Sequence, residues 1–279
     1  MNYIKEKFIK TALKIFHRLP DGIKLFLRSY KNQEAELYEL HWLVKKDTIA
    51  VDIGANNGAY TFVLSRLVGT HGRVLAIEPI EHLAGYLRRA CRQLRLPVDV
   101  KPLCLSSEER HAELLIPCSP EGELLTGYAN LGNRDAGTQS HFKKQPVALK
   151  RLDDLLNDRE LRVSFIKCDV EGHELEVLKG AIDILKTDRP NLLVEIEQRH
   201  LFEPIDTVFR FFESQSYKGY FLDKNGNLND LKSFNVNIHQ QYPPPEALEH
   251  QYIYNFIFLP SESPDAVHLR KQSKYEKKR

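Results

Sequence analysis

The sequence predicts an α/β fold built around a nucleotide-binding unit, and two observations support this class. An apolar run at residues 49–53 is followed by a tight turn between Gly54 and Gly58, and then by a helical pattern over residues 60–68. Strand, glycine turn and helix form the first unit of a nucleotide-binding α/β domain. Acidic residues also stand at the ends of several later strand-like segments, which is where an open α/β sheet binds its ligands.

Composition narrows the classes of protein further. The 279 residues are 42% hydrophobic and 28% charged, which suits one α/β domain with small additions. The formal net charge of +2 gives no indication of nucleic-acid binding, so we expect no nucleic-acid partner. The four cysteines form no C-x-x-C pair, and no apolar run has the length of a membrane span. Together these features indicate a cytoplasmic protein with reduced thiols.

The other segments predict the remaining elements in order. Before the glycine turn, residues 23–30 and 34–44 have helical patterns. Predicted strands lie at residues 73–77, 98–105, 113–116, 145–149, 163–168, 191–196, 217–222 and 252–259, and predicted helices at 83–94, 152–156, 175–185 and 208–212. The last two strands are able to pair as a terminal antiparallel hairpin. Residues 118–142 are irregular and carry four glycines, and so long a loop inside a compact domain is typically functional or disordered.

Both ends of the chain lie outside this pattern. We expect a helical extension over residues 1–45 and a basic tail over residues 261–279. Residues 3–19 combine flanking lysines with an apolar stripe, as do helices that lie at a membrane interface. The stripe consists of Ile4, Phe8, Ala12, Ile15 and Leu19. Because such a stripe is also ordinary for a helix packed on the core or on a second subunit, peripheral contact with the inner membrane face is one of two expectations.

The glycine turn favours one cofactor over another. A dinucleotide fingerprint reads G-x-G-x-x-G, but Asn56 replaces its middle glycine and the third glycine is absent. Asp52 also stands directly before the turn, and its carboxylate would repel a pyrophosphate while tolerating a cation. S-adenosylmethionine (SAM) carries a sulfonium and an ammonium group and no phosphate, so the turn suits SAM better than NAD. An NAD(P)-linked oxidoreductase and a scaffold that binds a cofactor without catalysis stay open as alternatives.

Acidic residues follow the strand ends along the chain. Glu78 ends the second strand, where a carboxylate binds a ribose diol. Asp169 ends the strand at 163–168, and Glu195 and Glu197 stand at the end of the next. Such a cluster would bind a cationic cofactor, a polyol or a metal. The spacing of Asp169, Glu171 and His173 is similar to a metal motif, but no second cluster has ligand spacing, so we expect no metal. Lys167 is expected to pair with a carboxylate.

Two motifs identify a family resemblance. The segment V-D-I-G-A-N-N-G-A-Y-T at residues 51–61 and the segment I-K-C-D-V-E-G-H-E-L-E-V-L-K-G at residues 166–180 resemble FkbM-type SAM-dependent methyltransferases. The pattern R-L-D-D-L at residues 151–155 and the strand end at Glu195 are also similar. The resemblance implies a Rossmann-like class I methyltransferase domain over residues 46–260. Its sheet would be mostly parallel and seven-stranded, with an antiparallel terminal hairpin.

The resemblance also implies an activity and site residues. The activity is O-methyl transfer, often to a sugar or glycan or to a small natural product. Glu78 would hold the ribose of SAM, and Leu105 and Ser106 would lie near its adenine. The residues that would surround its methionine end are Asp52, Gly54, Ala55, Asn56 and Gly58.

Methyl transfer to a hydroxyl requires a positioned base. The reaction is an in-line displacement, and a base adds about 10²–10⁴-fold to its rate because a hydroxyl is a weak nucleophile. Asp169 is the first candidate because it ends the strand expected nearest the methyl group, although it is equally suited to bind the cofactor or to cap the following helix. Glu171, His200 and His173 are the other candidates, with His173 more typical of a structural residue.

Overall fold

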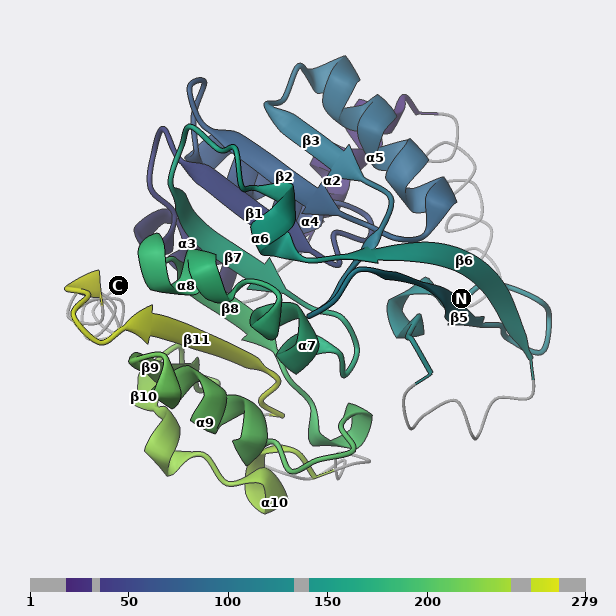
Figure 1. Ribbon diagram of the computed structural model, residues 1–279. Coiled ribbons are helices and arrows are strands. Elements are labelled where there is room, and N and C mark those ends of the chain that lie inside the picture. Colours follow the sequence, from purple (N-terminus) through teal and green to yellow (C-terminus); the bar gives the residue numbers. More distant parts are fainter. Residues whose placement is uncertain (1–18, 32–35, 133–140, 242–251, 266–279) are drawn as a thin grey trace, which may run out of the picture.

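A computed structural model of the protein describes residues 19–31, 36–132, 141–241 and 252–265, and its core is a large twisted sheet (Figure 1). Among these residues the sheet has eight strands in the order β10-β9-β11-β8-β7-β1-β2-β3. Their bounds are β1 Ile49–Ile53, β2 Arg73–Ile77, β3 Val98–Lys101, β7 Val163–Cys168, β8 Asn191–Glu195, β9 Tyr217–Leu222, β10 Leu228–Asp230 and β11 Asn255–Pro260. Strands β3, β2, β1, β7 and β8 are mutually parallel, so their carboxyl ends meet at one edge.

The antiparallel end of the sheet confirms one prediction and extends another. Strand β11 inserts between β8 and β9 and is antiparallel to both, which confirms the predicted pairing of the last two strands. The sheet has one strand more than the seven expected. Residues 223–227 turn the chain so that β10 pairs with β9, because the Asp223 carboxylate accepts backbone N–H groups from Asn225 and Asn227.

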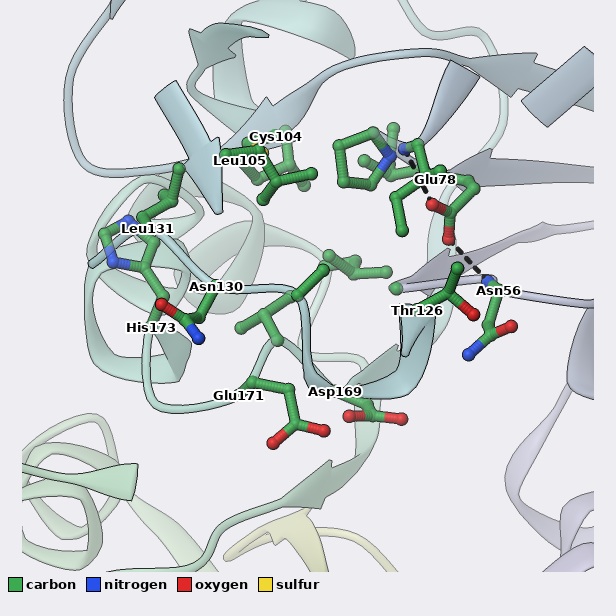
Figure 2. Close-up of a pocket in the computed structure, with 18 of the residues that line it drawn as sticks. Asn56, Glu78, Cys104, Leu105, Thr126, Asn130, Leu131, Asp169, Glu171 and His173 are labelled. Atoms are coloured by element: carbon green, nitrogen blue, oxygen red, sulfur yellow. Dashed lines mark hydrogen bonds between the residues drawn. The ribbon is translucent and has the colours of Figure 1, made fainter. Parts of the chain in front are cut away.

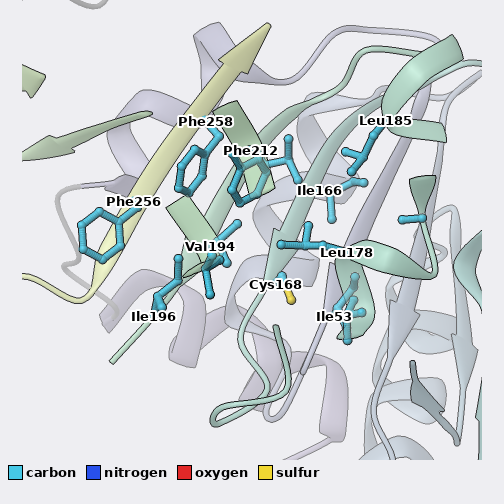
Figure 3. Packing of buried hydrophobic residues seen from close by; sticks show 14 of the residues in the cluster. Ile53, Ile166, Cys168, Leu178, Leu185, Val194, Ile196, Phe212, Phe256 and Phe258 are labelled. Carbon is cyan, nitrogen blue, oxygen red and sulfur yellow. The ribbon is translucent and has the colours of Figure 1, made fainter. Parts of the chain in front are cut away.

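Helices cover both faces of the large sheet (Figure 1). One face carries α6 Leu152–Leu155, α7 Glu174–Lys179, α8 Ile182–Thr187 and α9 Asp206–Ser214, and the other carries α2 Asp21–Lys31, α3 Glu36–Leu43, α4 Ala59–Leu67 and α5 Glu81–Leu94. Because alternate strand residues face opposite sides, Val51 and Ile53 join the first core and Ala50 the second. Figure 3 shows the first core, where Phe212 of α9 stacks on Phe258 of β11 at 3.6 Å between ring centroids.

A second, three-stranded sheet corrects one prediction. The strand predicted over residues 98–105 is two strands, since β3 ends at Lys101 and β4 (Cys104–Leu105) belongs to a different sheet. Pro102 stands between them, and its missing N–H group cannot continue a ladder. The small sheet has the order β4-β6-β5, with β5 at Arg110–Pro117 and β6 at Phe142–Lys150, and it extends away from the large sheet in Figure 1. It carries the short helix η1 Thr126–Tyr128 on the chain between β5 and β6.

The helix predicted over residues 175–185 is also divided, into α7 and α8. The break falls at Gly180, where an added Cβ would lie 2.0 Å from the backbone oxygen of Ser106. Close packing of this turn on the end of β4 therefore replaces a continuous helix.

The two termini of the described chain are tied to the domain. Leu25 of α2 is fully buried and packs with α5, as expected of a helical cap. After β11, the Asp265 carboxylate accepts hydrogen bonds from Lys45 and Asn191. The helix predicted over residues 3–19 lies outside the described residues apart from residue 19, and the tail predicted over residues 261–279 is described only as far as residue 265. Within the described parts of the chain, no helix is long and apolar enough to cross a membrane.

Candidate active site

The glycine turn after β1 packs directly on the end of β7. Gly54 has φ 77°, in the left-handed region, and a Cβ added to it would lie 1.9 Å from the backbone oxygen of Asp169. The N–H groups of Gly54 and Ala55 both donate to the carbonyl of Ile77 at the end of β2, at 3.0 and 2.9 Å. Gly58, with φ 84°, faces Leu87 of α5 in the same close way. The turn therefore has room for glycine alone at 54 and joins three strand ends.

Asp52 lies beneath this turn, fully buried. Its Oδ2 accepts a hydrogen bond of 2.5 Å from Thr61 of α4, and its Oδ1 has no hydrogen-bond partner in the described structure. It pairs in register with Lys167 of β7 across the β1–β7 ladder. Burial raises the pKa of Asp52, whereas the Lys167 charge lowers it. Asp52 is thus a buried acid below the turn and not part of the pocket wall.

Glu78 joins the turn to the chain that follows β2. Its Oε2 accepts the N–H of Asn56 at 2.7 Å and its Oε1 accepts the N–H of Ile80 at 2.8 Å, as the dashed lines in Figure 2 show. Burial raises its pKa to about 7, against the effect of these two hydrogen bonds. Each carboxylate oxygen has a second lone pair, so the group can still accept from a ribose hydroxyl.

A pocket opens between this turn and the small sheet (Figure 2). It encloses about 650 Å³ of empty space, including a part open to solvent. Of the predicted site residues, those that line it are Gly54, Asn56, Glu78, Leu105, Asp169, Glu171 and His173. Asp52, Ala55, Gly58 and Ser106 are buried and do not line the pocket, and neither does His200, whose Nε2 lies 3.0 Å from Glu171. The structure thus brings the lining residues together at one pocket, whereas the other predicted residues are not in its lining.

The pocket has an apolar slot next to Glu78. The small sheet supplies Cys104 and Leu105 from β4 and Leu114 from β5, and the adjoining loops supply Leu103 and Leu131. Ser106 lies just behind, and its hydroxyl makes a 3.0 Å hydrogen bond with His173 Nε2. Burial lowers the pKa of His173, which keeps its ring neutral. A flat, uncharged ring such as adenine suits this slot.

Part of the pocket wall was missed from the sequence. The loop between β5 and β6 supplies Thr126, Gly127, Ala129 and Asn130 to the lining. The Leu115–Asn130 bridge holds this loop on β5. No motif marks these residues, and the one signal was the length and glycine content of the irregular run at 118–142.

Two carboxylates stand side by side at the pocket wall after β7, and Figure 2 shows them adjacent. Asp169 accepts a 2.8 Å hydrogen bond from Lys167, which confirms that the lysine pairs with a carboxylate. Lys167 also lies 5.1 Å from the centre of the Tyr60 ring. Burial opposes the charge of Lys167, but the charges of Asp169 and Asp52 raise its pKa well above the ordinary value.

Glu171, the second of these carboxylates, has a different environment. Its backbone has φ 53°, which is uncommon for a residue other than glycine, and its Oε2 lies 3.0 Å from Nε2 of His200. Burial and the charge of Asp169 raise its pKa to about 8, although His200 lowers it. Glu195, at the end of β8, is affected by burial and by Asp169 in the same direction, with a pKa of about 9. Among the described residues, no three His, Cys, Asp or Glu side chains are grouped as metal ligands.

The turn, the acid at the end of β2 and the apolar slot define an α/β protein that binds a nucleoside-type cofactor. The acids around the turn suit a cationic one such as SAM. A family model described as the methyltransferase FkbM domain matches residues 52–220. The chain belongs to this family of SAM-dependent methyltransferases, and SAM is its cofactor.

Solved structures give weaker likenesses. An FkbM methyltransferase from Methylobacillus flagellatus KT is 15% identical with a TM-score of 0.48, and the match covers 91% of this chain and 59% of that chain. An O-methyltransferase from Bacillus cereus in complex with SAH is 13% identical with a TM-score of 0.40, covering 80% of this chain and 76% of the other. A SAM-dependent methyltransferase from Aquifex aeolicus is 16% identical with a TM-score of 0.38, covering 81% and 88%. No curated protein matches the chain.

Proposed function

We propose that this protein transfers the methyl group of SAM to a hydroxyl group of a sugar, a glycan or a small natural product. The observation that carries the proposal is the placement of Glu171 at the pocket wall, next to Asp169 and 3.0 Å from His200. A carboxylate with a raised pKa in such a position is suited to remove a proton from a weakly acidic hydroxyl.

Each part of the pocket has a proposed role in binding. The turn at Gly54 and Asn56 would surround the methionine end of SAM, and Glu78 would accept hydrogen bonds from its ribose. The slot at Leu105 would hold the adenine. When bound, SAM supplies a methyl group activated on a sulfonium. The acidic surroundings of Asp52 and Asp169 favour that positive charge.

Two candidate bases differ in their partners. The carboxylate of Asp169 already accepts a hydrogen bond from the Lys167 ammonium at 2.8 Å, which holds it in place. The pKa of Glu171, about 8, lies near a neutral working pH, where general-base catalysis is most efficient. We therefore assign proton removal to Glu171 and cofactor positioning to Asp169.

The assignment balances charge during the reaction. The acceptor oxygen forms a bond to the methyl carbon as its own O–H bond breaks, and Glu171 takes the proton and becomes neutral. At the same moment the positive charge at sulfur disappears. The net charge enclosed by the pocket is unchanged, which matters because a buried charge without compensation is costly.

The test compares two variants in a methyl-transfer assay with SAM. Candidate acceptors are found by mass spectrometry of glycans and metabolites from a deletion strain. Glu171→Gln is expected to lower kcat by about 10²–10⁴-fold while SAM affinity stays nearly constant. Asp169→Asn is expected to weaken SAM binding along with the rate. Full activity of Glu171→Gln, or methylation confined to amines, would contradict the proposal, and turnover of any acceptor excludes a role as a scaffold.

A further inference from the structure

Behind Glu171 lies a second acid, Glu197, whose carboxylate is held on all sides. Arg199 donates to both of its oxygens, at 2.7 and 2.8 Å, and the Tyr252 hydroxyl donates at 2.6 Å. The side chain is 7% exposed. Burial raises the pKa of Glu197, but its contacts with His200, Arg199 and Tyr252 outweigh this effect and lower the pKa to about 2. Glu197 is therefore a fixed negative charge.

His200 stands between this fixed charge and the pocket. Its Nε2 lies 3.4 Å from Oε1 of Glu197 and 3.0 Å from Oε2 of Glu171. The 3₁₀ helix η3 (Gln198–His200) sets this position, because the His200 N–H donates to the Glu197 carbonyl at 3.0 Å. Two carboxylates thus face one ring nitrogen, which favours the protonated ring although burial and the charge of Arg199 oppose it.

We propose that Glu197 keeps His200 positively charged, and that the imidazolium in turn stabilises the ionised form of the Glu171 carboxylate at the pocket wall. Glu197 is then a positioning residue, because His200 and Glu171 lie between it and the acceptor. The inference deepens the proposed function, since it rests on Glu171 as the base. The competing role is structural: Glu197 would merely join η3 to the chain before β11 through Tyr252.

The charges around Glu171 show why a cation is needed there. Those that face it are Asp169 at the end of β7, Glu174 of α7, Glu195 at the end of β8, and Glu197, Arg199 and His200 around η3. Most are acids, and Lys167 is already bound to Asp169. The imidazolium at 3.0 Å opposes burial and these acids, so without it Glu171 would favour its protonated form still more strongly and accept a proton less readily.

The experiment measures the charge of His200 directly and needs no acceptor. The full chain with ¹³C-labelled histidine is titrated by NMR, and His200→Gln identifies the His200 signal by its loss. Glu197→Gln keeps the size of the side chain and removes its charge, so the His200 titration midpoint is expected to fall by about 1–3 pH units. The matched control is Glu262→Gln, which breaks the Arg189–Glu262 pair at the surface and is expected to leave the midpoint in place.

Two further variants connect His200 to its neighbours. Tyr252→Phe removes one hydrogen bond from Glu197 and is expected to shift the His200 midpoint in the same direction by a smaller amount, which provides a milder test if Glu197→Gln does not fold. Glu171→Gln is expected to lower the His200 midpoint too, because coupling between two titrating groups is reciprocal. The charge of Glu197 also repels the Glu171 carboxylate directly, so Glu197→Gln would change the pKa of Glu171 in two opposite ways. The titration therefore follows His200, on which the charge of Glu197 acts in one direction.

The outcomes separate the inference from the proposed function. A lowered midpoint in Glu197→Gln and Glu171→Gln supports the inference. The inference is overturned if Glu197→Gln folds and its His200 midpoint equals that of the Glu262→Gln control. It is also overturned if Glu171→Gln leaves the His200 midpoint unchanged. If the midpoints shift as expected but Glu171→Gln retains full methyl transfer, the ionic chain stands and the assignment of the base fails.

Discussion

Replacing Gly54 by alanine tests the packing of the glycine turn on the end of β7. Two physical costs act at this position: a φ of 77° that L-residues rarely adopt, and an added Cβ 1.9 Å from the backbone oxygen of Asp169. The chain offers a control for each. Gly69 has φ 74° with no atom within 4 Å of an added Cβ, whereas Gly180 has φ −77° and a Cβ contact of 2.0 Å with the Ser106 oxygen.

The expected magnitudes follow from these geometries. Gly69→Ala carries only the backbone cost, about 1–2 kcal/mol of unfolding free energy. Gly180→Ala carries only the steric cost, about 1–3 kcal/mol for a forced backbone shift. Gly54→Ala carries both, so the loss is expected at about 2–5 kcal/mol if the two costs add. The backbone movement that relieves the contact in Gly54→Ala must also displace Asp169, so this variant is expected to lose SAM binding as well as stability.

Urea unfolding of the four proteins without cofactor measures stability, and isothermal titration with SAM measures binding. Gly69→Ala is expected to bind SAM as the unmodified protein does, which separates a stability effect from a site effect. A loss for Gly54→Ala no greater than that for Gly69→Ala would refute the close packing of the turn on β7. So would unchanged SAM affinity in Gly54→Ala.

Cofactor affinity, pH and membrane association give three further tests. Glu78→Ala is expected to weaken SAM binding about 10–150-fold in isothermal titration, since a hydrogen bond to a charged group contributes ~1.5–3 kcal/mol, and equal affinity would remove Glu78 from the site. The raised pKa values of Glu171 (about 8) and Glu195 (about 9) mean that the folded protein without SAM binds more protons than the unfolded chain, so its urea midpoint is expected to fall as pH rises toward 9, and a rising midpoint would contradict the burial of these acids. We also propose that the basic segments at residues 3–19 and 270–279 bind anionic vesicles, with co-sedimentation that decreases with salt and on deletion of either segment; protein that stays in the supernatant at low salt would exclude this.

The sequence predicted the parts of the site that depend on local chain geometry. Gly54, Glu78 and Asp169 each follow a strand, and parallel strands bring their carboxyl ends to one edge, so their meeting is predictable from spacing. The pairing of Lys167 with Asp169 follows equally from strand alternation. Each of these predictions needs only neighbours along one strand or across one ladder.

Other parts depended on contacts between distant segments. Leu105 was predicted near the adenine, but it was placed in the same strand as residues 98–101. Its actual strand, β4, pairs with β6 after the break at Pro102, and this pairing with a distant segment cannot be predicted from the local sequence. Asn130 and its loop reach the pocket through the second sheet, for which no motif exists. The arrangement of Tyr252 beside Glu197 joins residues 55 positions apart, and no periodicity predicts such a contact.

Residues from two separate sheets line the pocket, and among the described residues no strand is shared between the two sheets. This separation bears on how the family could diversify. The floor, from Gly54 to Glu78, is fixed by close backbone contacts that admit little change. The wall from Thr126 to Asn130 is carried by a hairpin outside that sheet, and an added Cβ at Gly127 would meet no atom within 4 Å. Substitutions there can change the shape of the space open to an acceptor while the residues proposed to bind SAM stay unchanged. Selection for a new acceptor, natural or in the laboratory, can therefore act on the loop between β5 and β6 without changing the turn after β1.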